Sequence, residues 1–187
     1  KFWILETLMR KSSYQPISGL LLLVICCSGC EALLQAQATR QERRKQEFID
    51  RIDVAQQQSH SWEEEQIHQL VNQHRVQLEL SSLSLRSEIS GVARIHSQNM
   101  ANGTVEFGHG GFQERATQIY KMIAFQKTAE NVAMNNTPSP GQAAIQGWLR
   151  SQGHKQNIEG NYNLTGIGVA QSTGGNYYFT QIFLSNR

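Results

Sequence analysis

Apolar side chains recur every three to four residues along two stretches in the middle of the chain. Between residues 61 and 80 they fall on one helical face, with Ser61 and Glu64 spaced as a capping box at its start. A second stripe begins near Ser84 and stops at Gly103, a residue that favours helix ends. The spacing therefore predicts two amphipathic helices, one over residues 61–80 and one from about Ser84 to Gly103.

Shorter apolar runs follow in the C-terminal half. They predict two further helices, over residues 112–124 and 140–153, and three strands, over residues 129–134, 167–170 and 177–183. A segment rich in glycine and polar residues joins the last two strands and is typical of a hairpin loop. Because a hairpin rather than a crossover joins the last strands, we expect an α+β three-layer sandwich rather than a doubly wound sheet.

The first thirty residues have the character of an export signal. Arg10 and Lys11 precede an apolar run of about a dozen residues, which is too short for a transmembrane helix. The run ends in Ser28-Gly29-Cys30, which resembles a bacterial lipobox. We therefore expect a signal peptide over residues 1–30 and a lipid anchor on Cys30. Ordinary signal-peptidase cleavage near Gly29 is the alternative. Either route exports the protein, as a cell-envelope lipoprotein or an extracellular protein.

Composition separates a spacer from a domain. Residues 31–60 are rich in Gln, Ala, Arg and Glu and lack a core-facing stripe, so we expect a solvated, partly helical linker. Residues 61–187 are long enough for one domain with a core. All three cysteines lie within the first thirty residues, which leaves the domain without a disulfide framework or thiolate metal site. A net charge of +2 with no basic helix in the domain argues against nucleic-acid binding.

The candidate chemistry is a Glu130-Asn131 pair between two histidines that have glycine neighbours, His109 and His154. Glycine lets the backbone turn sharply, so each imidazole can be presented from a loop. Neutral imidazoles and one carboxylate can share a divalent metal, bind a polar ligand or move protons. His74 and His96 lie on or beside the helical stripes, and we interpret both as structural histidines.

The segments that carry these residues resemble, in unbroken order, the CAP superfamily (cysteine-rich secretory proteins, antigen 5 and pathogenesis-related-1 proteins, or SCP domains), and its bacterial branch in particular. The matching segments are residues 72–75, 93–101, 107–111, 129–133, 148–154, 157–158, 167–170 and 178–183. The resemblance implies a three-layer α–β–α sandwich with a central, mainly antiparallel sheet, and a cleft lined by two histidines and two acidic residues. Three of these positions would be His109, Glu130 and His154. The fourth, acidic in the family, falls on Ser151, which removes one carboxylate.

These features favour a non-enzymatic binding module of the cell envelope, whose cleft takes a small ligand such as a lipid, glycan fragment or peptide. The first alternative is a peptidase-like hydrolase with Ser151 or a metal-bound water as nucleophile and His154 as base. No second carboxylate would orient that base, so we expect no turnover. The second alternative is a structural envelope protein, in which the loop histidines would be buried and fully hydrogen-bonded.

The resemblance also raises the question of a metal. Two histidines and one glutamate are the minimum for an open zinc-like site, which would use His109, His154 and Glu130. With serine at position 151 the site has one negative charge fewer to attract a cation. We therefore expect no required cofactor and only weak binding of a divalent metal such as zinc.

Overall fold

In the computed structural model the described residues are 18–57 and 61–186, and the chain divides into two compact units, Lys1–Gln46 and Glu47–Arg187. Helix α1 (Ser18–Gln57) contains most of the predicted linker, and its side chains from Ala32 onward through the first unit are exposed. No helix among the described residues combines the length and the apolar character needed to span a bilayer.

Part of the predicted N-terminal organisation cannot be compared with the structure. Residues 1–17 of the predicted signal peptide, and the linker end at residues 58–60, lie outside the described residues. The backbone at Cys30 is helical, but its side chain is also outside the described set. The lipid anchor and the boundaries at residues 30 and 60 therefore stay predictions.

The second unit is built on one four-stranded sheet with the order β1-β3-β4-β2. Strand β4 is antiparallel to both β3 and β2, and β1 adds a short parallel pairing to β3. The sheet is therefore mainly antiparallel, as predicted. Its strands are β1 (Ser84–Leu85), β2 (Lys127–Asn135), β3 (Leu164–Gln171) and β4 (Tyr177–Ser185).

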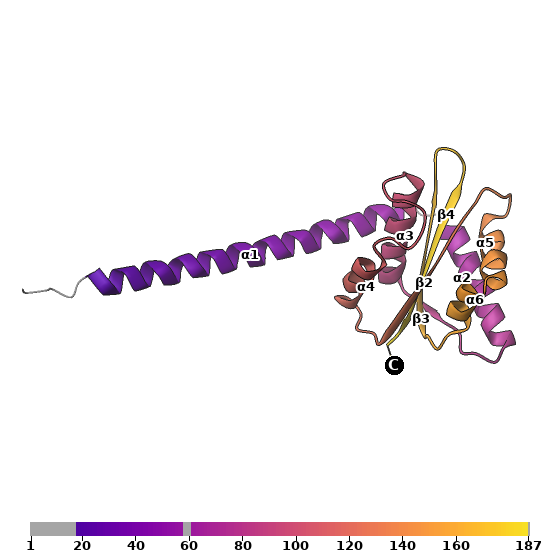
Figure 1. The fold of residues 1–187 in the computed structure, drawn as a ribbon, viewed down its shortest axis with the longest axis horizontal. Helices are drawn as coiled ribbons and strands as arrows, with labels where there is room; N and C mark the ends of the chain where they lie inside the picture. Colours follow the sequence, from indigo (N-terminus) through magenta and orange to yellow (C-terminus); the bar gives the residue numbers. More distant parts are fainter. Residues whose placement is uncertain (1–17, 58–60, 187) are drawn as a thin grey trace, which may run out of the picture. The chain divides into compact units, whose positions relative to one another are not determined.

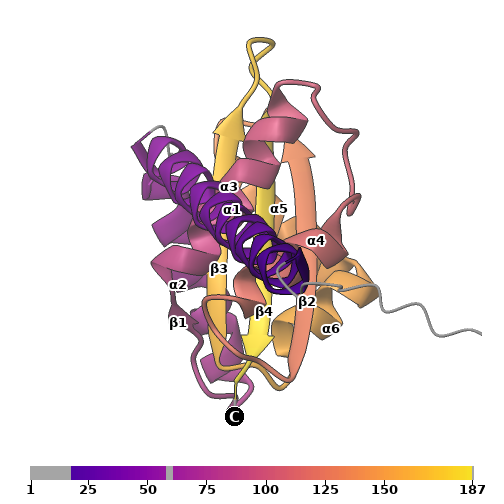
Figure 2. The same cartoon turned by 90° about the vertical axis from the view of Figure 1, so that its left-hand side faces the viewer.

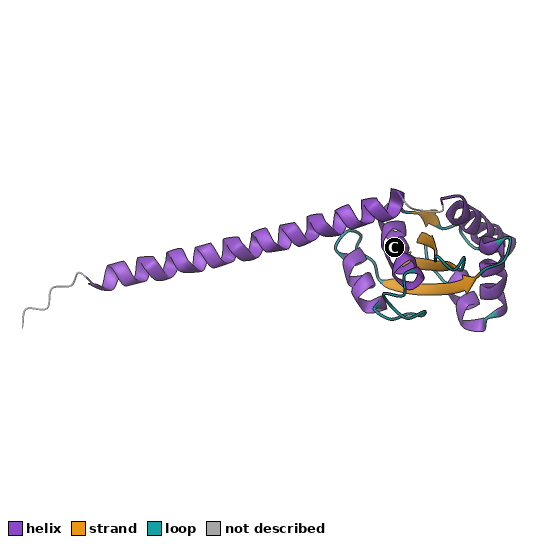
Figure 3. Cartoon of the chain, turned by 90° about the horizontal axis from the view of Figure 1, so that it is seen from above, coloured by secondary structure: helices purple, strands orange, loops and turns teal. Residues whose placement is uncertain are grey.

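Helices cover both faces of the sheet (Figure 1). Helices α3 and α4 lie on one face and α2, α5 and α6 on the other, and the view from above shows the sheet between the two helical layers (Figure 3). The three-layer α–β–α sandwich predicted from the sequence is confirmed. The helices are α2 (Ser61–Gln77), α3 (Ser87–Ala101), α4 (Phe112–Tyr120), α5 (Pro140–Arg150) and α6 (Gln152–Glu159).

Each helical layer buries its own apolar cluster against the sheet. Trp148, Phe179 and Phe183 are at most 1% exposed and anchor the cluster under α2, α5 and α6. Ile89 and Ile182 are fully buried in the cluster under α3 and α4. Alternation along the strands separates the two clusters, because successive side chains point to opposite faces of the sheet. The edge strand β2 lies beside β4 and is seen behind α4 in Figure 2.

Helix α3 packs unusually close to β3 because that strand presents glycine to it. A Cβ at Gly168 would lie 2.1 Å from the backbone nitrogen of Arg94, and one at Gly166 would lie 2.4 Å from backbone atoms of Ile89 and Ser90. Such distances exclude any larger side chain unless the helix moves. The glycines therefore set the height of α3 above the sheet.

Most elements differ from the prediction by a few residues at their ends, and two differences are larger. Ser84 and Leu85 form strand β1 rather than the start of a helix, because Ser84 and Arg86 donate backbone hydrogen bonds to Asn163 and Thr165. Helix α3 then begins at Ser87. The predicted helix over residues 140–153 ends at Arg150, and a second helix, α6, starts directly after Ser151. His154 therefore lies in a helix and not in a loop.

Candidate functional site

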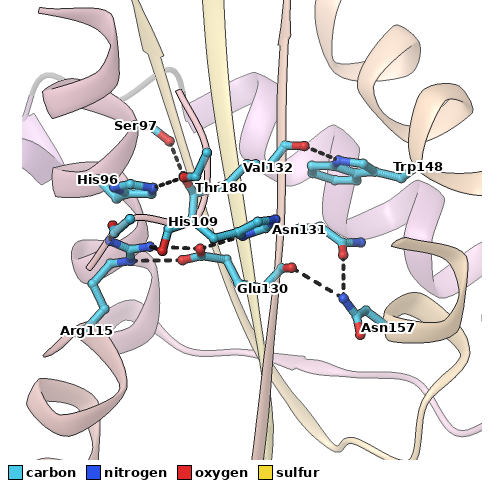
Figure 4. A network of polar contacts seen from close by, with 12 residues as sticks. His96, Ser97, His109, Arg115, Glu130, Asn131, Val132, Trp148, Asn157 and Thr180 are labelled. Carbon is cyan, nitrogen blue, oxygen red and sulfur yellow. Dashed lines mark hydrogen bonds and ion pairs between the residues drawn. The ribbon is translucent and has the colours of Figure 1, made fainter. Parts of the chain in front are cut away.

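The site is organised by two consecutive residues of the edge strand β2. Glu130 and Asn131 are both buried, and strand alternation directs their side chains to opposite faces of the sheet. The Glu130 side chain meets α4, and the Asn131 side chain meets α6 (Figure 4). One strand therefore connects both helical layers at this edge.

Glu130 is held by an arginine that the sequence analysis did not single out. Arg115 of α4 donates from Nε to Oε2 at 2.9 Å and from Nη2 to Oε1 at 2.8 Å, which makes a bidentate pair. The Glu130 side chain is 1% exposed and that of Arg115 11%. Charge-assisted bidentate pairs of this kind are among the stronger polar interactions in proteins. Glu130 is therefore fixed as an ionised hydrogen-bond acceptor.

His109 makes the third contact to the same carboxylate. Its Nδ1 lies 3.0 Å from Oε1 of Glu130, and its side chain is 51% exposed. Because the Glu130 carboxylate accepts, Nδ1 of His109 donates this hydrogen bond, and Nε2 is the ring nitrogen that Glu130 does not bind. His109 is therefore a half-exposed imidazole that its buried partner orients through Nδ1.

The loop that presents His109 is fastened at several points. Gly108 and Gly111 have φ angles of 142° and 74°, a region that favours glycine. Arg115 donates to the carbonyl of Gly110 at 2.7 Å, and Nε2 of His96 donates to the carbonyl of Gly108 at 2.9 Å. Burial, followed by the positive charge of Arg115, lowers the pKa of His96 below its usual value. The interpretation of His96 as a structural histidine is confirmed.

Helix α6 is tied to the edge of β2 by side-chain amides. Asn157 donates to the Glu130 carbonyl at 3.3 Å and to Oδ1 of Asn131 at 2.8 Å. Asn131 in turn donates to the backbone carbonyl of His154 at 3.0 Å. Trp148 of α5 donates its indole N–H to the carbonyl of Val132 at 2.9 Å. These bonds satisfy two carbonyls on the side of β2 that has no neighbouring strand.

A second arginine holds the far end of α6. The buried Arg75 of α2 donates to the carbonyls of Ile158 and Gly160 at 2.7 and 2.9 Å, where the negative end of the helix dipole lies. Its neighbour His74 bonds Glu159 at 2.9 Å, which agrees with the structural interpretation of that histidine. The position of α6, and with it His154, is therefore set by buried polar contacts.

The His154 ring has no such support. Its centroid lies 6.5 Å from that of His109, with the two planes tilted by 44°. In the part of the chain that the structure describes, no hydrogen bond reaches either of its ring nitrogens. Burial and the neighbouring His109 lower the pKa of His154 below its usual value, so the ring is neutral near pH 7. Two imidazoles therefore stand next to each other at the edge of β2.

The structure thus brings His109, Glu130 and His154 together, and Ser151 lies three residues before His154 at the joint between α5 and α6. Within residues 18–57 and 61–186 the Ser151 side chain caps neither helix, and it makes no hydrogen bond to His154. The solvent-accessible cleft expected around these four residues stays a prediction.

The arrangement does not fit a three-ligand metal centre. Among the described residues, no three His, Cys, Asp or Glu side chains are grouped so that they could hold a metal ion. The physical reason is Arg115, which occupies both oxygens of the Glu130 carboxylate. Of the three ligands expected from the sequence, the two imidazoles alone remain open to a ligand.

Residues 68–183 match the sequence pattern of the cysteine-rich secretory protein (CAP) family. A curated relative, the uncharacterized membrane protein YlbC of Bacillus subtilis strain 168, is 32% identical over 126 residues, which are 65% of this chain and 34% of YlbC. The chain therefore corresponds to about one third of that relative's length.

Solved structures share the fold of this chain. An extracellular Bacillus anthracis protein with an SCP domain superposes with a TM-score of 0.54 at 29% identity, over 67% of this chain and 41% of that one. An outer surface protein of Borrelia burgdorferi shares the fold, with a TM-score of 0.56 at 18% identity over 67% and 93% of the two chains. The family match over residues 68–183 includes His109, Glu130 and His154, and the chain belongs to the cysteine-rich secretory protein (CAP) family.

Proposed function

We propose that this protein is a non-enzymatic binding module of the cell envelope, and that His109 and His154 contact its ligand. The observation that carries the proposal is the His154 ring, which lies 6.5 Å from the His109 ring and, in the described part of the chain, has no hydrogen-bond partner. Buried polar groups around it are paired, so an unpaired imidazole is the group left to interact with another molecule.

The chemistry of the two rings limits the ligand. Near pH 7 the neutral His154 ring offers a nitrogen lone pair, Nε2 of His109 is not bound to Glu130, and the charge of Glu130 is balanced by Arg115. The site therefore suits a ligand with hydrogen-bond donors, such as the hydroxyl groups of a glycan or lipid headgroup or the N–H groups of a peptide. A divalent metal such as zinc would bind weakly, through the imidazoles, and is not required.

An envelope location agrees with the relatives, which are named as a membrane protein, an extracellular protein and an outer surface protein. The lipid anchor at Cys30 would place the module at a membrane surface. Labelled palmitate should be incorporated into the wild-type protein and not into Cys30→Ala, which should also be released from membranes. Palmitate that never labels the wild-type protein would favour a simply secreted form.

The binding proposal is tested with the purified protein on an array of lipids, envelope glycans and peptides, with and without a chelator. We expect a retained ligand whose binding falls at least about tenfold in His154→Ala, because one hydrogen-bonding group is worth about 1.4 kcal/mol. His68→Ala is the matched control, since that half-buried histidine of α2 bonds the carbonyl of Leu83 and, among the described residues, has no hydrogen bond to α6 or the site. Equal retention by His154→Ala and the wild type would contradict the proposal.

A hydrolase remains the second candidate, and the structure changes which residue would be its base. His109, with Nδ1 on Glu130, has the orientation by a carboxylate that a general base requires, whereas His154 does not. Ser151 is not hydrogen-bonded to either ring, so a bound water would be the nucleophile. Turnover of peptide or ester substrates that His109→Ala abolishes and Ser151→Ala preserves would favour this candidate over the binding module.

A further inference from the structure

We propose that Arg115 takes the place of a metal ion at this site, so that Glu130 belongs to the protein scaffold and the paired histidines are assembled without any divalent cation. The inference concerns what balances the Glu130 charge. It holds whether or not the site binds an envelope ligand, and its test uses zinc alone.

The first argument is that the carboxylate is buried and already accepts three hydrogen bonds, two of them from Arg115. Oε2 accepts from Nε of Arg115 at 2.9 Å, and Oε1 accepts from Nη2 of Arg115 at 2.8 Å and from Nδ1 of His109 at 3.0 Å. The side chain is 1% exposed. A zinc ion would need a carboxylate oxygen at about 2.0–2.2 Å and would lie beside a guanidinium that is also positively charged. The cation would therefore have to displace Arg115.

The second argument is that Arg115 also joins separate segments, as a metal ion does. Besides Glu130 on β2, its Nη1 binds the carbonyl of Gly110 at 2.7 Å and its Nη2 lies 3.5 Å from the carbonyl of His109. One guanidinium thereby connects α4, the His109 loop and the edge strand (Figure 4). Guanidinium suits this task because its five donors lie in a rigid plane and its charge cannot be lost.

The domain contains a second bidentate arginine–glutamate pair. Arg94 of α3 donates to both oxygens of Glu64 of α2, with distances of 2.6 to 3.1 Å and side chains 15% and 5% exposed. Loss of that arginine also leaves a buried carboxylate without its guanidinium, at a pair that includes neither His109 nor His154. Arg94→Met is therefore the matched control for Arg115→Met.

The experiment is thermal unfolding and zinc titration of the wild-type protein, Arg115→Met and Arg94→Met, each with zinc and with a chelator. Both substitutions should lower the midpoint of unfolding. Zinc should restore it in Arg115→Met only, because the freed Glu130 carboxylate and His109 then form a metal site. We expect zinc binding at least about tenfold tighter than in the wild type, and its loss in Arg115→Met/His109→Ala.

Two results would overturn the proposal. In the first, a chelator lowers the unfolding midpoint of the wild type and zinc restores it. The site would then depend on a metal ion even with Arg115 in place. The other is a folded Arg115→Met that zinc neither stabilises nor binds. If Arg115→Met does not fold even with zinc, the wild-type protein is tested by NMR instead. The Arg115 Nε–H resonance should keep its chemical shift and its slow hydrogen exchange at saturating zinc. Loss of this resonance would mean that the metal displaces the guanidinium, and would also overturn the proposal.

Discussion

At the two edges of the sheet, backbone groups without a neighbouring strand are hydrogen-bonded in different ways. At each edge the helical layers on opposite faces approach one another, and some backbone groups lack a neighbouring strand. On β3 this holds beyond its two-residue pairing with β1, and at this β3 edge Ser90 accepts from the amide of Ile167, and Glu64 accepts from the amide of Val169 at 3.3 Å. At the β2 edge, Trp148 and Asn157 donate to strand carbonyls instead.

Each edge also has a buried, bidentate arginine–glutamate pair, and here the two differ in what lies beyond the pair. Arg94 and Glu64 link α3 to α2 directly and close the β3 edge. Arg115 and Glu130 lie on one side of β2, and the layers meet through His109 and His154, of which His109 is half exposed. The ion pairs are shared features of the scaffold, and the imidazoles distinguish the edge that can bind a ligand.

The largest expected effect tests whether the two ion pairs are equivalent. Arg94→Met and Arg115→Met should each lower the free energy of unfolding by about 3–5 kcal/mol, because each leaves a buried carboxylate uncompensated. Urea unfolding measures the loss, and His109 ring resonances should shift in Arg115→Met and not in Arg94→Met. A loss below about 1 kcal/mol, as for surface pairs, would show that the carboxylates reach water.

The next prediction concerns the close packing behind the β3 edge. Gly168→Ala should destabilise the protein by about 1–3 kcal/mol, since its Cβ would overlap the α3 backbone. Gly147→Ala in α5 is the control, because a Cβ there has no atom within 4 Å. It should stabilise the helix by up to about 1 kcal/mol. Equal effects of the two substitutions in thermal unfolding would mean that α3 can shift freely.

At the β2 edge, Asn157→Leu should cost about 1–3 kcal/mol, because the Glu130 carbonyl and Oδ1 of Asn131 lose a donor. Amide hydrogen exchange in α6 should become faster, since this anchor of the helix is lost, while exchange in α3 stays unchanged. The exposed Asn136→Leu serves as control. Unchanged exchange in α6 would mean that Arg75, without Asn157, fixes the position of α6 and of His154.

The smallest effect is a pH dependence. The pKa of His96 is lowered in the folded protein by burial and by Arg115, although Glu130 opposes the shift and His109 adds to it. Below about pH 6.5 the unfolded chain then binds more protons than the folded one. The free energy of unfolding therefore decreases as the pH is lowered, by at most about 1.4 kcal/mol per pH unit for this group. His96→Gln can still donate to Gly108 but cannot titrate, and should show a shallower dependence between about pH 5 and 6.5. An unchanged slope would assign the dependence to other groups.

The elements with periodic patterns could be predicted from the sequence, and those created by distant pairing could not. Strand β1 has two residues, too few for a pattern, and exists because β3 supplies its partners. The Gly153 that was expected to end a helix lies inside the first turn of α6 instead. Local sequence alone predicts neither strand β1 nor the start of α6, because both depend on contacts with segments that are distant in the sequence.

The site divides in the same way. His109, Glu130 and His154 could be predicted because glycine neighbours and a family resemblance single them out. Arg115 and Asn157 were missed because polar residues on helices usually face water. One signal was available for Arg115, which shares its helical face with the apolar Ala116 and Ile119. Glu64 was assigned to a helix cap, and the fold adds a bidentate pair with Arg94, thirty residues away, which the local sequence does not indicate.

The side-chain caps on β2 have a consequence for association. An unpaired edge strand is a template on which another chain can add a strand, and such additions lead to aggregation. Here the indole of Trp148 and the amide of Asn157 occupy the carbonyls that an incoming strand would use, at Val132 and Glu130. The same contacts that position α6 thus protect the outermost strand from self-assembly, and β2 can present a binding residue close by without becoming a nucleus for fibres.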